Sequence, residues 1–153
     1  MSDYFRGTCY HTADEKARLA IPAKFRDVVK KSGDDSGVVV SKWADHLVAY
    51  TMGRWSDLER NIVENATKTD KMQRFIRFFI GGAHECQFDK QGRILLPGDL
   101  REYAGIEPRT EVSLVGALDH LEIWSRERLV LEDERLEKDL EDPEFRELVN
   151  SLM

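Results

Sequence analysis

Polar turns alternate with short apolar runs along this chain, and one such arrangement occurs twice. Residues 14–26 and 89–101 each contain a polar turn, a short apolar run, a proline and an amphipathic segment that ends in arginine. A proline at that point suits the first turn of a helix, because its missing N–H group costs nothing there. Each copy therefore predicts a turn, a strand and the start of a helix. The matching residues, at a constant offset of 75 positions, are Asp14 and Asp89, Arg18 and Arg93, Leu19 and Ile94, Ile21 and Leu96, Pro22 and Pro97, Phe25 and Leu100, and Arg26 and Arg101.

The repetition continues beyond this motif. Residues 45–50 match residues 119–124 at an offset of 74, so one residue was gained or lost in a loop between them. Self-similarity of this kind indicates the tandem duplication of a small module. One module has too few apolar residues to bury its own hairpin, so we expect two interdigitated copies to share a core. The predicted units are a first repeat, a connecting helical hairpin, a second repeat and an acidic helical tail, at residues 1–53, 54–80, 81–128 and 129–153.

Hydrophobic periodicity predicts short strands within the repeats, and helices between and after them. Alternating strands and short turns are typical of a mainly β fold of the α+β class, with a compact barrel core and peripheral helices, and not of a parallel α/β sheet. In the connecting hairpin, Phe75, Phe78 and Phe79 fit either core packing or a ligand-binding box, and helical spacing favours core. The expected strands are residues 8–13, 19–21, 38–41, 47–50, 85–88, 94–96, 111–116 and 121–124. The expected helices are residues 22–30, 55–66, 71–80, 97–104, a helix capped by Ser125 and broken by Pro143, and residues 144–152.

Composition limits the class of protein. A chain of 153 residues forms one domain, or two small ones with a common core, and 41% hydrophobic with 34% charged residues is an ordinary soluble balance. No stretch approaches the ~20 apolar residues of a membrane helix, so we expect no membrane partner. The N-terminus lacks the apolar centre of a signal peptide. The two cysteines form no disulfide framework. A reduced, cytoplasmic protein is the expectation.

The charge distribution is uneven. The net charge of −6 argues against a nucleic-acid partner when it is taken for the whole chain. Residues 126–153, however, hold ten acidic and five basic residues, which leaves 19 acidic and 18 basic residues in the first 125. A local basic face is therefore possible. The basic residues of the two motifs are Lys16, Arg18, Lys24 and Arg26 in the first, and Lys90, Arg93 and Arg101 in the second.

Two short patterns could carry metal chemistry. Cys9 and His11 align with His84 and Cys86, and a zinc site with two cysteines and two histidines would be chemically sensible. Alternate strand residues share only a face, however, and the spacing matches no common zinc motif, so we expect no metal and no other cofactor. The four histidines are scattered, and no nucleophile–base or paired-carboxylate arrangement is present. We therefore expect a protein that is not an enzyme.

The doubled motif occurs together with other short sequences that resemble the MraZ family, a bacterial relative of the AbrB/SpoVT transition-state regulators. The resemblance covers nearly the whole chain to about Arg128. It implies a pseudo-symmetric, double-ψ or swapped-hairpin AbrB-type β-barrel built from two tandem repeats in one chain. The further sequences that carry the resemblance are Phe5-Arg6-Gly7, Gly81-Gly82-Ala83-His84-Glu85-Cys86, Leu114-Val115-Gly116 and Glu122-Ile123-Trp124.

The same resemblance implies a function. It indicates a sequence-specific, DNA-binding transcriptional regulator of the division and cell-wall gene cluster, which binds repeated sites on double-stranded DNA that include its own promoter. It implies a nucleoid-associated ring of identical subunits, about eight in number, whose closed symmetry is that of most oligomers. The alternative is a protein-interaction or antitoxin-like module on the same fold, which would pair through its acidic C-terminal helices.

Arg18 and Arg93 are the principal candidate site residues, because the resemblance places both on the surface that faces DNA. An arginine on a tight turn can donate two hydrogen bonds to guanine O6 and N7, or hold a phosphate. Asp14, Asp89 and Gly92 are expected to shape the two turns. A structural reading, in which each arginine only pairs with its aspartate, is the alternative. The further candidate DNA contacts are Lys16, Lys24, Lys90, Arg6 and Arg26, with Arg26 and its counterpart Arg101 equally suited to structural ion pairs.

One position departs from the family pattern. The family usually has glycine before the arginine in both copies, and Gly92 keeps it where Ala17 does not. If this position needs a left-handed backbone, alanine costs about 1 kcal/mol or more. We therefore expect the first turn to be reshaped, with a different reach for Arg18.

Overall fold

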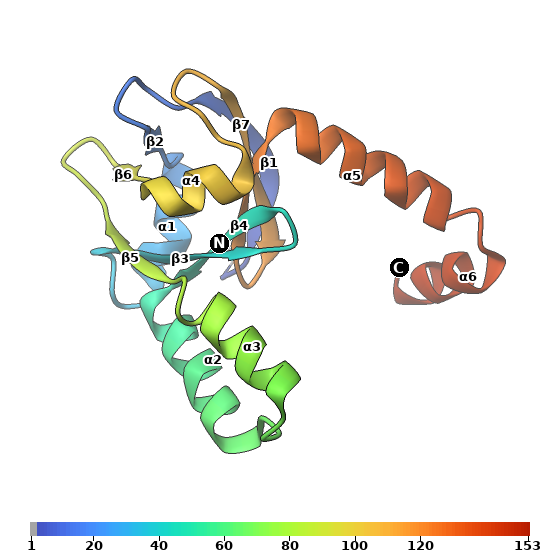
Figure 1. The fold of residues 1–153 in the computed structure, drawn as a ribbon. Helices are drawn as coiled ribbons and strands as arrows, with labels where there is room; N and C mark the ends of the chain where they lie inside the picture. Colours follow the sequence, from blue (N-terminus) through green and yellow to red (C-terminus); the bar gives the residue numbers. More distant parts are fainter. Residues whose placement is uncertain (1–2) are drawn as a thin grey trace.

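The computed structural model describes residues 3–153 and shows a mainly β, mixed α/β fold in which the two repeats share one body (Figure 1). The strands are β1 (Phe5–Thr12), β2 (Arg18–Ala20), β3 (Gly37–Trp43), β4 (His46–Thr51), β5 (His84–Gln87), β6 (Arg93–Leu95), β7 (Glu111–Leu118) and β8 (Leu121–Ser125). The helices are α1 (Ala23–Lys31), α2 (Met52–Asn65), α3 (Asp70–Phe79), α4 (Gly98–Ala104), α5 (Arg126–Asp139) and α6 (Pro143–Leu152).

The two repeats exchange strands. Six antiparallel strands form one sheet in the order β1-β7-β8-β4-β3-β5, and β2 pairs with β6 in a separate two-stranded ribbon. The first strand of each repeat therefore lies beside the hairpin of the other repeat, with β1 on β7 and β5 on β3. Neither repeat can complete its own hydrogen bonding, so both must fold together.

Strand register reproduces the offsets seen in the sequence. The β2–β6 ribbon is symmetric about the pair Leu19 and Ile94, which are equivalent at an offset of 75. The β4–β8 pairing is symmetric about Val48 and Glu122, which are equivalent at an offset of 74. Each pairing is therefore centred on a pseudo-two-fold axis. The tandem duplication predicted from the sequence is confirmed.

The barrel expected from the sequence is not closed. The six-stranded sheet has two edges, β1 and β5. The β2–β6 ribbon lies beside both edges, where β2 contacts β1 and β6 contacts β5. Each ribbon strand has three residues and is followed shortly by Pro22 or Pro97, which has no N–H group to donate. The ribbon strands are therefore too short to join the larger sheet into one continuous ladder.

The core lies between the sheet and the ribbon, under α1 and α4. Both repeats contribute to it, and full burial of one Leu or Ile side chain contributes about 1.5–3 kcal/mol. A second cluster lies where α2 and α3 pack on the sheet, with Val39, Val48, Trp55 and Phe79 buried and Phe75 and Phe78 packed against them. The largest side chains of the main core that are less than 2% exposed include Phe25, Leu19, Leu47, Ile94, Leu96, Leu100, Leu114, Leu121 and Ile123.

Two helical pairs project from this body in different directions (Figure 1). We call α2 and α3 the arm and α5 and α6 the tail. The cap predicted at Ser125 is confirmed, since its hydroxyl accepts a hydrogen bond from the Arg128 N–H at 3.3 Å. The corresponding helix of the first repeat, α2, is capped in the same way by Thr51, which lies 74 positions earlier.

The backbone corrects one expectation about the first turn. Ala17 adopts φ 60° and Gly92 adopts φ 76°, so both turns place a left-handed residue before the arginine. The Ala17 N–H donates to the Asp14 carbonyl at 2.9 Å, and the Gly92 N–H donates to the Asp89 carbonyl at 3.0 Å. The first turn is therefore not reshaped. Alanine adopts the strained conformation because the exchanged strands hold both ends of the turn.

A polar cluster occupies the axis of the β4–β8 pairing. The equivalent residues His46 and His120 both turn Nε2 toward Oε2 of Glu122, at 3.6 Å and 3.3 Å respectively. His120 Nδ1 also lies 2.8 Å from Asp119 Oδ1. Hydrogen bonding to Glu122 and Asp119 raises the pKa of His120, against the opposing effect of burial. The pKa of Glu122 is lowered, first by His120 and then by the approach of His46.

The left-handed position generates a prediction about stability. Gly92→Ala should lower the free energy of unfolding by about 1–2 kcal/mol, because alanine is strained there and its Cβ would meet the Arg26 side chain. That Cβ would lie 2.7 Å from Arg26 Nε, which is held by the Ile21 carbonyl. Ala17→Gly should change stability by less than about 0.5 kcal/mol, because relief of strain is offset by lost burial and greater chain entropy. Denaturant titration measures both, and equal effects of the two variants would contradict this reading of the turns.

The axial cluster generates a prediction about pH. A histidine with a raised folded pKa stabilises fully below its ordinary value of 6.5, and this stability is lost as pH rises through the folded pKa. The difference in unfolding free energy between the wild type and His120→Gln should therefore shrink as pH rises from about 6 through the folded pKa. The lowered pKa of Glu122 makes its own contribution present above 4.5 and lost toward more acid pH.

The double variant His120→Gln/Glu122→Gln is the control for this pH dependence. It should lose little more stability near pH 6 than the more damaging single variant, because both singles break one interaction. A His120→Gln effect that is constant across this range would show that the histidine does not act through its charge.

Candidate nucleic-acid interface

The first turn is organised by a single carboxylate. Asp14 Oδ1 accepts hydrogen bonds from the N–H groups of Lys16 at 2.9 Å and Arg18 at 2.8 Å. Its Oδ2 accepts a hydrogen bond from Arg18 Nε at 2.6 Å. The Asp14 N–H donates in turn to the Arg18 carbonyl. One aspartate therefore closes the turn and fixes the plane of the guanidinium.

The second turn repeats this arrangement. Asp89 Oδ1 accepts from the N–H groups of Gln91 and Arg93, both at 2.9 Å, and Asp89 Oδ2 accepts from Arg93 Nε at 2.8 Å. In both turns the hydrogen bond from the arginine N–H lowers the pKa of the aspartate, and the arginine side chain lowers it further. Both carboxylates are therefore ionised at neutral pH, and the arginine and aspartate of each turn act as a unit.

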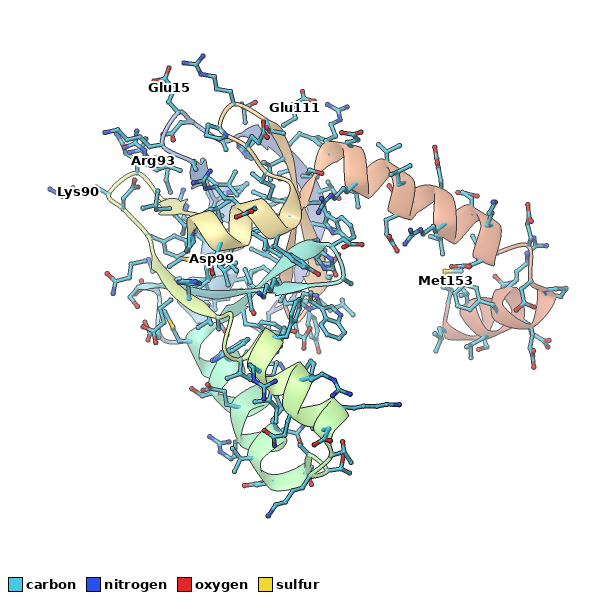
Figure 2. The ribbon with its side chains drawn as sticks, viewed as in Figure 1. Glu15, Lys90, Arg93, Asp99, Glu111 and Met153 are labelled. Carbon is cyan, nitrogen blue, oxygen red and sulfur yellow. The ribbon has the colours of Figure 1, made fainter. Side chains whose placement is uncertain are left out.

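The β2–β6 pairing brings the two turns together. Leu19 and Ile94 point into the core and are fully buried. Residues on either side of them in the ribbon point outward, so Arg18 and Arg93 share the outer face. Arg93 Nη1 also lies 3.7 Å from Asp14 Oδ2, which couples the second arginine to the first turn. Figure 2 shows Arg93 at this end of the body, beside the two turn loops.

The guanidinium groups reach the surface. The Arg18 side chain is 35% exposed and the Arg93 side chain is 27% exposed, so neither is buried inside the protein. Each aspartate holds Nε, which leaves the two Nη groups of Arg18 without a hydrogen bond to any residue of 3–153. An oriented guanidinium with free Nη groups can donate two parallel hydrogen bonds to a ligand that lies outside the ribbon.

The turn tips add further charge. Lys16 and Lys90 are exposed, and Figure 2 shows Lys90 extending away from the body. Glu15, the counterpart of Lys90, forms an ion pair with Arg109 from the loop before β7. The two turns therefore present arginine and lysine side chains, while their acidic residues are engaged by basic neighbours within the protein.

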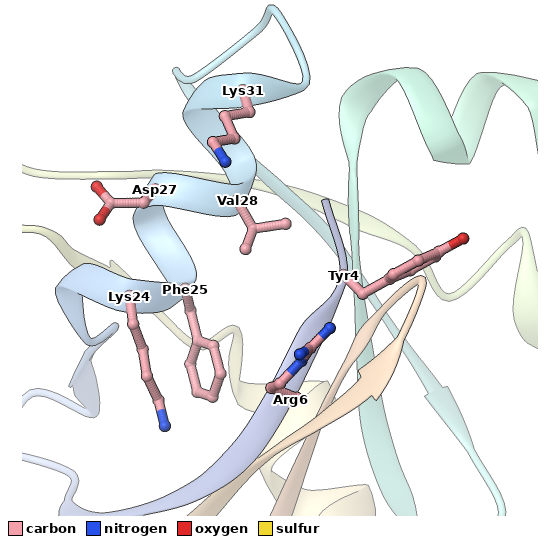
Figure 3. Close-up of a pocket in the computed structure, with 7 residues that line it drawn as sticks. All are labelled: Tyr4, Arg6, Lys24, Phe25, Asp27, Val28 and Lys31. Atoms are coloured by element: carbon pink, nitrogen blue, oxygen red, sulfur yellow. The ribbon is translucent and has the colours of Figure 1, made fainter. Parts of the chain in front are cut away.

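Lys24 and Arg6 lie together but in a different place. Both line a pocket of about 220 Å³ between α1 and β1, which also includes Tyr4, Phe25 and Lys31 (Figure 3). The Lys24 ammonium group lies 5.0 Å from the centre of the Phe25 ring. None of the turn residues lines this pocket. The structure therefore separates the expected basic residues into the turn pair and a flank.

Arg26 and Arg101 have structural roles. Arg26 Nε donates to the Ile21 carbonyl at 2.9 Å, and Arg101 Nε donates to the Leu96 carbonyl at 3.2 Å. Both side chains thus bridge the proline that joins strand to helix. The sequence analysis expected structural ion pairs for Arg26 and Arg101. In the structure, backbone carbonyls and not carboxylates accept the hydrogen bonds of their Nε groups. A DNA contact by Arg26 stays a prediction.

Leu95 is a residue of this face that the sequence did not single out. Its place in an apolar run predicts burial, but it is 60% exposed. It pairs with Arg18 across the ribbon and so lies on the same outer face. Its exposure could have been predicted from the alternation of side chains along a strand, because Ile94 and Leu96 point inward and the residue between them must point outward.

The possible zinc ligands are not brought together. Cys9 lies on β1 and Cys86 on β5, which are the opposite edges of the sheet, and His84 pairs with Asp99 at 3.0 Å. Burial raises the pKa of the Cys86 thiol to about 11, which disfavours the thiolate that binds metals. Residues 3–153 contain no group of three or more His, Cys, Asp or Glu side chains placed to hold a metal ion.

Comparisons with known proteins agree with this architecture. The model of one family, described as "MraZ protein, putative antitoxin-like", matches residues 4–78 and again residues 79–148. Within residues 3–153, no helix has both the length and the apolar character needed to cross a membrane.

Several similar proteins carry the same family name. A protein of Desulforapulum autotrophicum named transcriptional regulator MraZ is 48% identical over 148 residues, which cover 97% of this chain and 98% of that protein. The protein of the same name in Desulfosudis oleivorans is 43% identical with the same coverage. That of Moorella thermoacetica is 43% identical over 127 residues, or 81% of this chain and 82% of its own. The duplicated strands and turns, the two tandem matches and these identities show that the chain belongs to the MraZ family.

Proposed function

We propose that this protein is a transcriptional regulator that binds double-stranded DNA in a sequence-specific way through the paired turns. The observation that carries the proposal is the convergence of Arg18 and Arg93 on one outer face, each held by an aspartate through Nε. The relatives named transcriptional regulator MraZ support the same function.

The geometry suits base recognition. Because Nε is held by the aspartate, the plane of each guanidinium is fixed, and the Nη groups of Arg18 are free to donate to guanine O6 and N7 in the major groove. Fixing the guanidinium in advance reduces the side-chain entropy lost on binding. Leu95, exposed beside Arg18, would contact the methyl group of thymine. We assign base contacts to Arg18, Arg93 and Leu95.

The lysines suit phosphate contacts. Lys16 and Lys90 are exposed in the two turns that carry the arginines and would contact the DNA backbone. Arg6, Lys24 and Arg26 are assigned as peripheral contacts at most, since the first two lie in the flanking pocket and the third is held by a carbonyl. The net charge of −6 does not oppose this proposal, because the acidic excess is concentrated in the tail.

One barrel-like body offers few contacts, so we propose that several copies act together. In this proposal the repeats at 1–53 and 81–128 carry the DNA contacts, and the segments at 54–80 and 129–153 serve assembly. A ring of identical subunits would place many equal faces on repeated sites, and linked binding events gain through effective concentration. By family resemblance, the sites lie upstream of the division and cell-wall gene cluster and of the protein's own gene, and the ring is nucleoid-associated in the cytoplasm.

A second candidate function is a protein-interaction module. The description of the matching family as antitoxin-like favours it, as do the exposed apolar residues of the tail. Such a module would capture a partner protein and would not need the paired turns to bind DNA. Neither candidate requires catalysis.

The arginine pair is tested by substitution. Arg18→Ala and Arg93→Ala should each weaken binding to the protein's own upstream region roughly 10- to 100-fold, since one bidentate contact to a base contributes about 1–3 kcal/mol. The double variant should lose sequence preference altogether. Lys30→Ala is the control, because Lys30 is an exposed basic residue in the last turn of α1 and belongs to neither turn nor to the segments assigned to assembly. If the double variant binds the upstream region as tightly as the wild type, the site assignment is wrong.

The lysine pair gives a different signature. Lys16→Ala/Lys90→Ala should weaken binding to all DNA sequences alike and reduce the slope of log affinity against log salt by about two. Fluorescence anisotropy at several salt concentrations, with specific and scrambled duplexes, measures both effects. An unchanged salt slope would remove these lysines from the phosphate contacts.

A further inference from the structure

The flanking pocket between α1 and β1 has a cationic side. Lys24 and Lys31 come from α1 and Arg6 comes from β1, and all three residues are exposed. Figure 3 shows their side chains around the space between the helix and the strand. Asp27 is the one acidic residue among the described residues of the lining, so the pocket carries a net positive charge.

The two lysines are not neutralised by carboxylates of the protein. Neither Lys24 nor Lys31 forms an ion pair within the described part of the chain, although Asp27 lies on the same helix between them. Arg54, in contrast, is paired with Asp119 at 2.9 Å. The positive charge of the two lysines is therefore available to an anionic ligand.

The ammonium group of Lys24 is held in place by the strand below it. Gly7 adopts φ 90°, a conformation that favours glycine, and a Cβ at this position would lie 2.7 Å from Lys24 Nζ. The same ammonium lies 5.0 Å from the centre of the Phe25 ring, which attracts a cation. The Phe25 ring in turn packs edge-on against Phe5. A cation fixed in this way loses little side-chain entropy when it binds a ligand.

The pocket continues along α1 into a second cavity. Tyr4, Val28 and Lys31 line both the flanking pocket and an adjoining cavity of about 320 Å³. Tyr4 is 56% exposed, which leaves much of its ring uncovered where the two spaces meet. The two cavities thus form one groove, with cations at one end and an aromatic ring in the middle. The other residues that line the second cavity are Asp3, Phe5, Ser32, Thr51, Arg54 and Asp119.

This groove suits a ligand that has both a phosphate group and an aromatic ring. Phosphate oxygens accept strong hydrogen bonds from ammonium and guanidinium groups. A heterocyclic base stacks well on an exposed tyrosine ring. The hydroxyl and carboxylate groups of the second cavity can bond to a ribose or to the edge of a base. Inorganic phosphate alone would leave the aromatic and polar parts of the groove unused.

We propose that the flanking pocket and the adjoining cavity bind a nucleoside diphosphate. Arg6, Lys24 and Lys31 hold the phosphates, and the ring of Tyr4 stacks on the base. Neither Arg18 nor Arg93 lines either cavity, so this site is separate from the paired turns and its ligand binds without DNA. The proposal therefore goes beyond the proposed function and does not rest on it.

Equilibrium dialysis of the full-length protein with ADP, GDP, CDP and UDP tests the class of ligand. At least one of these nucleotides should bind to the wild type. The corresponding nucleoside should bind roughly tenfold more weakly or worse, because it lacks the charged groups that the cations hold. If none of the nucleotides binds, or if the nucleoside binds as tightly as its diphosphate, the proposal is wrong.

Substitutions in and outside the groove test its location. Lys24→Gln/Lys31→Gln should weaken nucleotide binding roughly tenfold or more, because it removes two cations from the phosphates. Asp27→Asn should strengthen binding, because it removes the acidic group from the lining. Lys30→Gln/Lys71→Gln is the matched control, since it removes the same charge outside both cavities, and it should change affinity less than about twofold.

All five substituted positions are exposed, so each variant should keep the wild-type circular dichroism spectrum. Equal losses in the double variant and its control would show attraction to overall charge and not a site, and would overturn the proposal. Weaker binding by Asp27→Asn would also contradict it, because the acidic group would then hold the ligand.

The backbone of a nucleic acid is another source of phosphate, and the same variants distinguish it. Binding of the upstream duplex by Lys24→Gln/Lys31→Gln should fall much less than binding of the nucleotide. If this variant loses duplex affinity and keeps nucleotide affinity, the pocket contacts DNA and the nucleotide site is wrong. If the nucleotide results are as expected while the wild type binds no DNA, the nucleotide site stands and the proposed function fails.

Discussion

The exchange of strands between the two repeats is the constraint on which the rest of this structure depends. Because β1 lies on β7 and β5 lies on β3, each repeat completes the other's sheet and both contribute to one core. The ribbon of β2 and β6 can then form only across the pseudo-two-fold axis. This pairing carries the two turns to one end of the molecule and sets Arg18 and Arg93 on a common face.

Pseudo-symmetry does not make the two turns equal. Alanine occupies a left-handed position in one turn and glycine in the other, at Ala17 and Gly92. The exposed acid Glu15 corresponds to the exposed base Lys90, and Arg93 reaches Asp14 at 3.7 Å. Under the proposed function, a two-fold frame with unequal side chains would contact two different DNA half-sites with one chain. Duplication within one chain thus allows each face to diverge, which two identical subunits would not permit.

Much of this fold could be predicted from the sequence, because the two offsets define equivalent strands and the register follows from them. The open barrel could not be predicted. The apolar run at residues 94–96 does not reveal that its strand is only three residues long and stays separate from the larger sheet. The exposure of Leu95 follows from alternation once the ribbon is known. The cluster of His46, His120 and Glu122 depends on packing at the axis, where residues far apart in sequence meet. The direction of the tail depends on Arg128, whose carbonyl partners lie on two other segments.

Guanine recognition by an aspartate-held arginine is the central claim, and replacement of guanine by 7-deazaguanine in the upstream duplex tests it most directly. This replacement removes the N7 acceptor and leaves the phosphate backbone unchanged. The account predicts that one or more such replacements weaken binding of the wild type roughly tenfold or more, and have no further effect on the Arg93→Ala variant. Equal losses for the wild type and the variant at every guanine would contradict it.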